Sequence, residues 1–307
     1  MVHSIFMKSD IPNPVSSFVF DRRVHRQHRS RARHRFGDHD FLFRLSADQL
    51  VERLYDIKRQ YATVLDLGCR DSSITTALAS HTHFGIKTLI QASAVPISSL
   101  ASVKLNLICD EESLPFHETV FDLVLSNLSL HWVNDLPGSL IQIRQSLRPD
   151  GLFCASLFGA GTLSELREVL LEAEIAVTGG ASPRVSPFAE VRELGGLLQR
   201  AGFALPVVDV DKITVTYANI FKLMSDLRGM GETNALLNRQ KLFTRRSIFL
   251  KAAALYTERY GDQSGRIPAS FQIITMTAWS PHADQPKPLR PGSATTSLTK
   301  ILRDRGR

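Results

Sequence analysis

Cysteines are few and long apolar runs are lacking, and each absence excludes a class of protein. No stretch approaches the ~20 consecutive apolar residues of a membrane-spanning helix, so we expect none. The three cysteines, Cys69, Cys109 and Cys154, lie far apart and form no Cys-x-x-Cys pair. Their spacing argues against a zinc cluster or a disulfide framework and suits a reducing compartment. The pair His282-x-Asp284 resembles an iron-binding pattern, but that pattern belongs to a β jelly-roll, so we expect no metal site.

The positive charge of the chain is unevenly distributed. The 307 residues carry a net charge of +7, and 43% hydrophobic with 22% charged residues is typical of a globular protein with a full core. Seven arginines and three histidines crowd the segment from Arg22 to Arg35. We interpret residues 1–40 as a basic N-terminal arm whose arginines are solvated or lie on a helix face. The alternatives are an acidic partner or anionic lipid, whereas nucleic acid is disfavoured because no RNA-binding module is present.

The chain is organised around residues 64–75, which read Val-Leu-Asp-Leu-Gly-Cys-Arg-Asp-Ser-Ser-Ile-Thr. The apolar run closed by Gly68 is typical of a buried parallel strand, and the apolar residues from Ile74 onward have helical spacing. A strand, a tight turn and a helix start form the opening unit of a doubly wound sheet. In such sheets the ligand sits beyond the carboxyl end of this strand.

The remaining pattern predicts a mostly parallel seven-stranded α/β sheet with helices on both faces and helical insertions near the C-terminus. A helix within 41–61, with Ser46 as its N-cap, opens a main domain over residues 41–280. The expected strands are 64–67, 87–91, 105–109, 121–126, 152–157, 207–217 and 271–279. The expected helices include 136–147, 162–175, one that ends at 201–203, and 220–260 with a break near 229–231. Residues 281–307 are proline-rich and are expected to form an extended tail.

The run from Asp66 to Cys69 resembles the first motif of class I S-adenosylmethionine (SAM)-dependent methyltransferases, Asp-x-Gly-x-Gly-x-Gly. The resemblance implies a Rossmann-like class I methyltransferase fold and SAM as the cofactor. Arg70 and Ser72 replace the second and third glycines. Such loops use glycine because the backbone bends with positive φ or approaches a ligand closely. We therefore expect SAM binding to be weak or lost.

Two further cofactor contacts are expected where the second and third strands end. The ribose hydroxyls usually meet a carboxylate after the second strand, but the chain has no Asp or Glu between Asp71 and Asp110. Gln91 or Ser93 can bind a hydroxyl there, with less charge assistance than a carboxylate gives. An acid for the adenine amine is present after the third strand, where a solvated helix cap is the alternative. The predicted cofactor-binding residues are Asp66, Gly68, Cys69, Arg70, Gln91, Ser93, Asp110 and Glu111.

A polar constellation follows the fourth strand, at the edge where parallel strands end together. Asn127 is a candidate to orient an amide or guanidine, His131 to move protons near neutral pH, and Trp132 to stack on a flat group. Each has a structural alternative: capping for Asn127, a half-buried histidine with satisfied partners for His131, and core filling for Trp132. We take these three as the candidate catalytic residues.

Motifs over nearly the whole chain resemble bacterial relatives of mitochondrial complex I assembly factor five. They lie at 126–140 (SNLSLHWVNDLPGSL), 148–153, 161–167, 182–191, 200–211, 226–234 (DLRGMGETN) and 285–294. The malonyl-ACP carboxyl methyltransferase of biotin synthesis is a more distant relative. The resemblance implies hydroxylation of an arginine in the quinone-site subunit of NADH:quinone oxidoreductase during assembly. It also marks Arg184, Arg228, Glu232 and Asn234 as candidate substrate or partner contacts.

Three functions from different classes stay open on the sequence alone. The chain is an enzyme that hydroxylates a protein arginine, a SAM-dependent methyltransferase acting on a small-molecule or protein carboxylate, or a non-catalytic assembly chaperone with a degenerate SAM site. The C-terminal motifs favour the first and the third, because a generic methyltransferase does not need them. The resemblance implies the cytoplasm of a bacterium, at the periphery of the inner membrane, or the mitochondrial matrix of a eukaryote.

Overall fold

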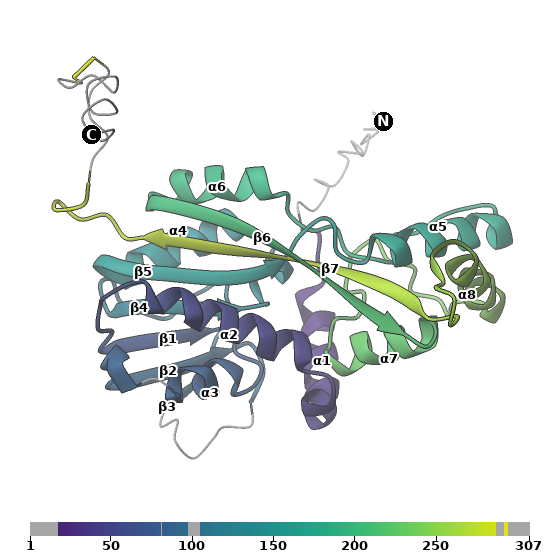
Figure 1. Cartoon of the computed structure of the whole chain (residues 1–307), viewed down its shortest axis with the longest axis horizontal. Coiled ribbons are helices and arrows are strands. Elements are labelled where there is room, and N and C mark those ends of the chain that lie inside the picture. Colours follow the sequence, from purple (N-terminus) through teal and green to yellow (C-terminus); the bar gives the residue numbers. More distant parts are fainter. Residues whose placement is uncertain (1–17, 81, 98–104, 287–291, 294–307) are drawn as a thin grey trace, which may run out of the picture.

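The computed structural model describes residues 18–80, 82–97, 105–286 and 292–293 (Figure 1). Its strands are β1 (Thr63–Leu67), β2 (Thr88–Ser93), β3 (Leu105–Ile108), β4 (Phe121–Asn127), β5 (Leu147–Phe158), β6 (Ala204–Tyr217) and β7 (Ile267–Trp279). Its α-helices are α1 (Arg22–Ala32), α2 (Phe41–Tyr55), α3 (Ser73–Ala79), α4 (Leu136–Ser146), α5 (Ser164–Thr178), α6 (Val191–Arg200), α7 (Ile220–Gly229) and α8 (Arg246–Tyr260). Short 3-10 helices are η1 (Arg33–Asp38), η2 (Thr82–Phe84) and η3 (Leu130–Trp132).

The strands form a single seven-stranded sheet with the order β3-β2-β1-β4-β5-β7-β6. Neighbours from β3 to β5 pair in parallel, whereas β7 pairs antiparallel with both β5 and β6. The predicted Rossmann-like class I methyltransferase fold is therefore confirmed. Because the parallel strands end at the same edge, the loops after β1, β2, β3 and β4 meet there.

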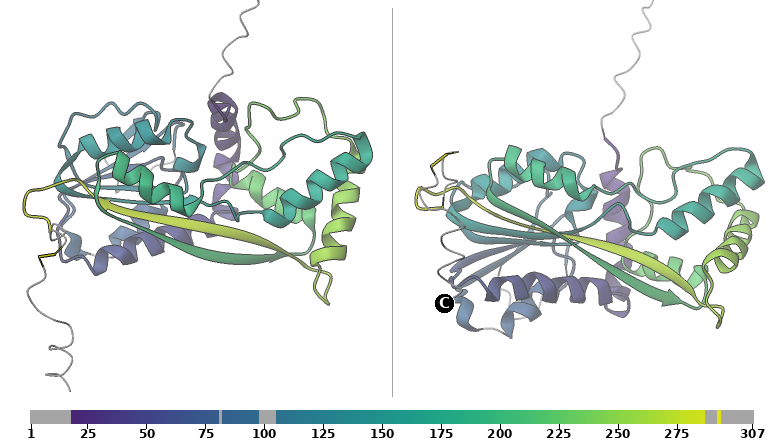
Figure 2. Two further views of the ribbon diagram at one scale, coloured as in Figure 1. Left: turned by 90° about the horizontal axis from the view of Figure 1, so that it is seen from above. Right: turned by 45° about the horizontal axis from the view of Figure 1, so that its top comes forward.

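Helices cover both faces of the sheet because successive strand residues point to opposite sides. Leu123 and Leu125 of β4 pack in one core cluster with α2 and α3, whereas Val124 packs in another with α4 and α6. All three side chains are fully buried, and Figure 2 shows the two helical layers. Burial on both faces explains why these strands are continuous apolar runs in the sequence.

The two antiparallel strands are longer than the parallel ones and extend beyond them (Figure 1). Helices α5, α7 and α8 pack against this extension around a separate core that includes Tyr256 and Phe271. We call this part, residues 164–178 and 218–266 with the strand ends beside them, the C-terminal lobe. It contains the insertion between the last two strands that the sequence predicts.

Helix α1 lies between the carboxyl edge of the sheet and the C-terminal lobe (Figures 1 and 2). Asp21 caps the helix, because its side chain accepts a hydrogen bond from the backbone N–H of Val24 at 3.1 Å. Before the helix, Phe20 forms a β-bridge with Leu236 of the lobe. After it, Phe36 is buried in the core of the lobe. The helix is therefore held at both ends.

Some predicted boundaries are wrong. Helix α2 begins at Phe41, not after Ser46, because the residues that follow Asp40 already pack into the core. The hydroxyl of Ser46 lies inside this helix and donates to the hydroxyl of Ser156 at 2.7 Å. The break predicted near 229–231 extends over residues 230–245. No helix within the described ranges has the length and apolarity needed to cross a bilayer.

Candidate functional site

The turn after β1 requires glycine on two counts. Gly68 has a φ of +75°, and a Cβ built on it would lie 2.2 Å from the hydroxyl oxygen of Ser129. Its backbone N–H donates to the carbonyl of Ala92 at 2.8 Å, and that of Cys69 donates to the same oxygen at 3.0 Å. The turn is thereby fixed against the end of β2 through its N–H groups. The carbonyls of Gly68 and Cys69 take no part in these two hydrogen bonds.

Those carbonyls are occupied by an arginine from helix α1. The Nη2 of Arg29 donates to the carbonyls of Gly68 at 3.2 Å and Cys69 at 2.8 Å, and to the hydroxyl of Ser93 at 3.0 Å. Its Nη1 lies 3.4 Å from Oε1 of Glu111. Arg29 is only 5% exposed. The guanidinium thus binds four of the residues that the sequence analysis assigns to SAM.

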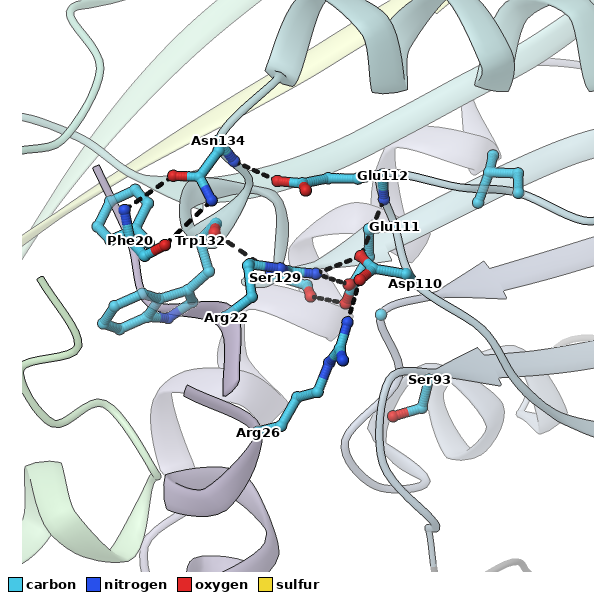
Figure 3. Close-up of polar contacts among 12 residues, drawn as sticks. Phe20, Arg22, Arg26, Ser93, Asp110, Glu111, Glu112, Ser129, Trp132 and Asn134 are labelled. Atoms are coloured by element: carbon cyan, nitrogen blue, oxygen red, sulfur yellow. Dashed lines mark hydrogen bonds and ion pairs between the residues drawn. The ribbon is translucent and has the colours of Figure 1, made fainter. Parts of the chain in front are cut away.

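The carboxylates after β3 bind the same helix (Figure 3). Arg22 donates to Asp110 at 2.7 Å and also contacts Glu111, and Arg26 pairs with the other oxygen of Asp110. The hydroxyl of Ser129 donates to Glu111 at 3.0 Å. Burial opposes the charge of Glu111, but the attraction of the arginines outweighs burial and holds its pKa below the ordinary value.

The residues of the loop do not fit SAM as they are arranged. Cavities of about 20 Å³ and about 10 Å³ lie beside it among the described residues. Pockets that bind small-molecule ligands measure about 300–1,000 Å³. The expectation of a solvated arm is wrong for Arg22 and Arg29, which are largely or fully withdrawn from solvent. The physical reason is that α1 presents arginines at helical spacing to the acids that would otherwise face a cofactor.

A second ionic cluster connects the loop to the C-terminal lobe. Arg70 pairs with Glu232 and donates to the carbonyl of Met230 at 2.7 Å. The indole N–H of Trp132 donates to Glu232 at 2.8 Å, and Nε2 of His131 lies 3.2 Å from the same carboxylate oxygen. Arg70 therefore points toward the insertion, and Glu232 joins the residues that follow β4 to it.

The charge of this cluster is well defined. Burial alone would raise the pKa of Glu232, but Arg70, His131 and the hydrogen bond from Trp132 lower it to about 2. Burial lowers the pKa of His131, although Glu232 acts against that shift. At neutral pH the cluster thus holds an ionised carboxylate and a neutral imidazole.

The three candidate catalytic residues are not equally placed. His131 and Trp132 lie together at Glu232, but the amide of Asn127 donates to the carbonyl of Phe43 at 2.8 Å and accepts from Ser156 at 3.0 Å. Asn127 therefore has structural partners, but they are not those of the capping role that the sequence suggested. One face of Trp132 is already covered, because the ring of His25 stacks on it at 4.4 Å between centroids.

The remaining predicted cofactor residues form a small buried network. The amide of Gln91 donates to Asp66 at 3.4 Å and to Thr75 at 3.0 Å. Burial raises the pKa of Asp66 to about 7 and that of the Cys69 thiol well above its ordinary range. These groups support the turn from beneath.

The four candidate substrate residues all line one cavity of about 310 Å³, which is bounded by the C-terminal lobe, Trp132 and the loop that contains Arg184. We call it the C-terminal cavity. Its lining includes Trp132, Leu163, Leu166, Leu170, Arg184, Phe188, Met224, Leu227, Arg228, Glu232, Asn234 and Phe249. Arg184 is paired with Glu174 at 2.7 Å, and Asn234 donates to the carbonyl of Pro183 at 2.8 Å. The cavity combines apolar walls with a buried carboxylate at one end.

Sequence reasoning missed the site residues of helix α1 and Ser129. A signal was available for the helix: Arg22, Arg26 and Arg29 follow a 4-3 spacing that places them on one face. The acids after β3 offered partners for that face. No local pattern indicated that Ser129 would contact the turn at Gly68.

Comparisons with known proteins place the chain in a family. A model described as a methyltransferase domain matches residues 65–155. The chain is 42% identical over 296 residues to the human protein named arginine-hydroxylase NDUFAF5, mitochondrial, covering 94% of this chain and 85% of that protein. The chain belongs to the NDUFAF5 arginine-hydroxylase family. Its Danio rerio member is 41% identical over 291 residues, covering 92% of this chain and 89% of the relative.

Other relatives are more distant than these NDUFAF5 proteins. The malonyl-[acyl-carrier protein] O-methyltransferase of Halorhodospira halophila is 30% identical over 276 residues, covering 87% of this chain and 90% of that protein. The solved YcgJ protein of Bacillus subtilis has a TM-score of 0.52 at 13% identity, covering 77% of this chain and 98% of the other, and supports the fold alone. The resemblance found in the motifs is confirmed, and the NDUFAF5 family is one of enzymes in the SAM methyltransferase superfamily.

Proposed function

We propose that the chain hydroxylates an arginine of a protein partner, the quinone-site subunit of NADH:quinone oxidoreductase, during assembly of that complex. The observation that carries the proposal is the 42% identity to an arginine-hydroxylase over 94% of the chain. That likeness includes the lobe with its cavity, not only the sheet. The malonyl-[acyl-carrier protein] O-methyltransferases are less similar, at 30% over a comparable share.

The C-terminal cavity supports the proposal as the place for the arginine side chain. Its apolar walls suit the aliphatic stem of an arginine, which packs along apolar surface while its head stays polar. Glu232 stands at one end of the cavity. Trp132 and His131 bind its Oε2, and Arg70 pairs with Oε1, which accepts no hydrogen bond from the described residues. Because a carboxylate offers about four acceptor positions, Oε1 keeps room for a guanidinium N–H.

The chemistry of hydroxylation sets what else must enter. One C–H bond is replaced by C–O–H, dioxygen supplies the inserted atom, and a two-electron reductant with two protons converts the other oxygen atom to water. Methylation is disfavoured, since Arg29 occupies the carbonyls of the turn that the sequence motif assigns to SAM. His131, neutral and beside Glu232, is the candidate to exchange a proton with that carboxylate, although His131 does not itself line the cavity.

Partner and place follow from the same proposal. The protein acts on an immature subunit in the bacterial cytoplasm, at the periphery of the inner membrane, or in the mitochondrial matrix if the source is a eukaryote. The non-catalytic chaperone is the second candidate, and the filled cofactor turn is the observation that favours it.

Mass spectrometry of the quinone-site subunit tests these functions against each other. In cells that lack the chain, we expect its arginine to lack one oxygen atom and the complex to accumulate in an immature form. Complementation with Phe249→Arg, which places a cation in the cavity wall, should leave the arginine unmodified. Phe221→Arg adds the same charge on the exposed side of α7 and should restore the product.

Substituting His131→Ala or Trp132→Ala should also abolish the product, with folding checked by circular dichroism. A methyl group on the wild-type arginine would replace hydroxylation by methyl transfer. An unmodified arginine in wild-type cells, together with failed assembly in the deletion strain, would leave the chaperone function.

A further inference from the structure

A second large cavity lies beside helix α1, on the side away from the cofactor turn. It measures about 520 Å³ and is bounded by α1, η1 and α7. Its lining comprises His28, Arg31, Ala32, Arg35, His39, Ser225, Arg228, Gly229 and Thr233. We call it the basic cleft, because three arginines line it and no acid does.

The arginines of the basic cleft differ from those that face the cofactor turn. Arg31 on α1, Arg35 on η1 and Arg228 on α7 are exposed, and among the described residues none of their side chains makes a hydrogen bond or ion pair. Arg31 follows Arg22 by nine residues, which at about 100° per residue places it on the opposite side of α1. The arginines on one face of α1 therefore pair with the acids after β3, whereas Arg31 on the other face carries an unpaired charge.

The described acids near the cleft form no ion pair with its three arginines. Asp226, on α7, is bound by the Nδ1 of His39 at 2.7 Å. Glu232 is engaged by Arg70, His131 and Trp132. The cleft thus holds three unpaired guanidinium groups in a concave surface, and guanidinium forks match carboxylates in a bidentate geometry.

The basic cleft adjoins the C-terminal cavity. Arg228 and Thr233 line both of them, so a bound polypeptide that passes over these two residues can occupy both cavities. The C-terminal cavity also has a surplus of cations, with Arg184, Arg228 and Arg239 against Glu232, although Arg184 and Arg239 have acidic partners elsewhere. An arginine side chain entering there is favoured when acidic residues accompany it.

We propose that the basic cleft binds an acidic segment of the substrate protein, while an arginine of that same substrate protein enters the C-terminal cavity. This inference rests on the proposed function for the identity of the second cavity's occupant. Substrate recognition then has two parts, the arginine at Glu232 and carboxylates at Arg31, Arg35 and Arg228. A peptide is favoured over a lipid surface because the cations line a concave cleft continuous with a side-chain cavity, not a flat face.

Fluorescence anisotropy with two synthetic peptides tests the proposal. One fluorescein-labelled peptide carries a single arginine flanked by four glutamates, and the other has glutamines in the glutamate positions. The wild-type protein should bind the glutamate peptide about tenfold more tightly in about 0.05 M salt, with the preference shrinking in about 0.5 M salt. Arg31→Gln with Arg35→Gln should reduce the preference to about twofold.

A matched control separates the cleft from general charge. Arg23→Gln with Arg192→Gln removes the same two charges at exposed positions outside both cavities and should keep the tenfold preference. Equal binding of both peptides by the wild type would overturn the proposal, as would an equal loss in the control. Loss of binding to phosphatidylglycerol vesicles, with peptide binding unchanged in the cleft variant, would replace it by a membrane contact.

The binding assay is independent of the reaction. A glutamate preference that depends on Arg31 and Arg35 supports the cleft even if the cellular arginine proves unmodified, in which case only the hydroxylase function fails. If the cellular arginine is hydroxylated but the protein shows no preference for the glutamate peptide, the proposal for the basic cleft is overturned and the hydroxylase function stands.

Discussion

Glu111 is the residue whose replacement tests most directly whether helix α1 is anchored in the cofactor turn. It is fully buried, and its two oxygens contact Arg22, Arg29 and Ser129. Glu111→Gln keeps the shape of the side chain and removes its charge. Arg22 retains Asp110, but Arg29 is left with neutral acceptors alone.

The magnitude follows from that burial. Removing one member of a buried ion pair costs about 3–5 kcal/mol, because the other charge stays buried without its counterion. We expect the lower end, about 3 kcal/mol of unfolding free energy at pH 7, since the carbonyls of Gly68 and Cys69 still receive Arg29. Glu258→Gln makes the same chemical change at an exposed position on α8 and should cost less than about 0.5 kcal/mol.

Urea denaturation followed by circular dichroism and tryptophan fluorescence measures the difference. Trp132 reports on α1 directly, because His25 stacks on its ring. The pKa of Glu111 in the folded protein lies below its ordinary 4.5, so its stabilising contribution is complete above that pH and is lost as the pH falls through the folded value. The gap between wild type and variant should therefore narrow in acid. A gap below about 1 kcal/mol at pH 7, or one that is constant down to pH 3, would refute the anchoring by charge.

Two further predictions concern the turn itself. Burial raises the pKa of Asp66 to about 7 from 3.8, so the stability of the wild type should fall as the pH rises between these values. At pH 8, Asp66→Asn should therefore have a higher free energy of unfolding than the wild type, by on the order of 2 kcal/mol in urea denaturation. In calorimetry, the triple variant Arg70→Gly, Ser72→Gly, Ser93→Asp should still bind SAM weakly because Arg29 remains in place. Adding Arg29→Ala should tighten binding about tenfold or more, and tight binding by the wild type would contradict the filled turn.

The sheet could be predicted because its determinants are local. Strands such as 121–126 are short apolar runs closed by polar residues, and burial on both faces leaves no other placement for them. The boundaries that failed depend on packing partners distant in sequence. Phe43 adds a turn to the start of α2 because it is buried against Phe36. The segment 230–245 is held open by contacts with Phe20, just before α1, and with the 180–188 loop.

The site was less predictable, for a physical reason. Its ion pairs join residues such as Arg22 and Asp110, which are 88 positions apart, and no periodicity links two segments over that distance. Charge composition correctly identified an unusual N-terminal segment, but it does not distinguish a solvated arginine from one withdrawn into a carboxylate-lined pocket. Glu232 and Arg228 were found only through the family motif in which they lie.

The contacts of α1 make cofactor binding at the turn and the observed position of Arg29 mutually exclusive. Any group placed on the carbonyls of Gly68 and Cys69 has to displace Arg29. Arg29 packs at Gly231, next to the residue that carries the carboxylate of the cavity, and the same helix stacks His25 on Trp132. Movement of α1 would therefore remove support from two walls of the cavity at once. The turn that the sequence motif assigns to a cofactor thus anchors the helix that shapes the cavity.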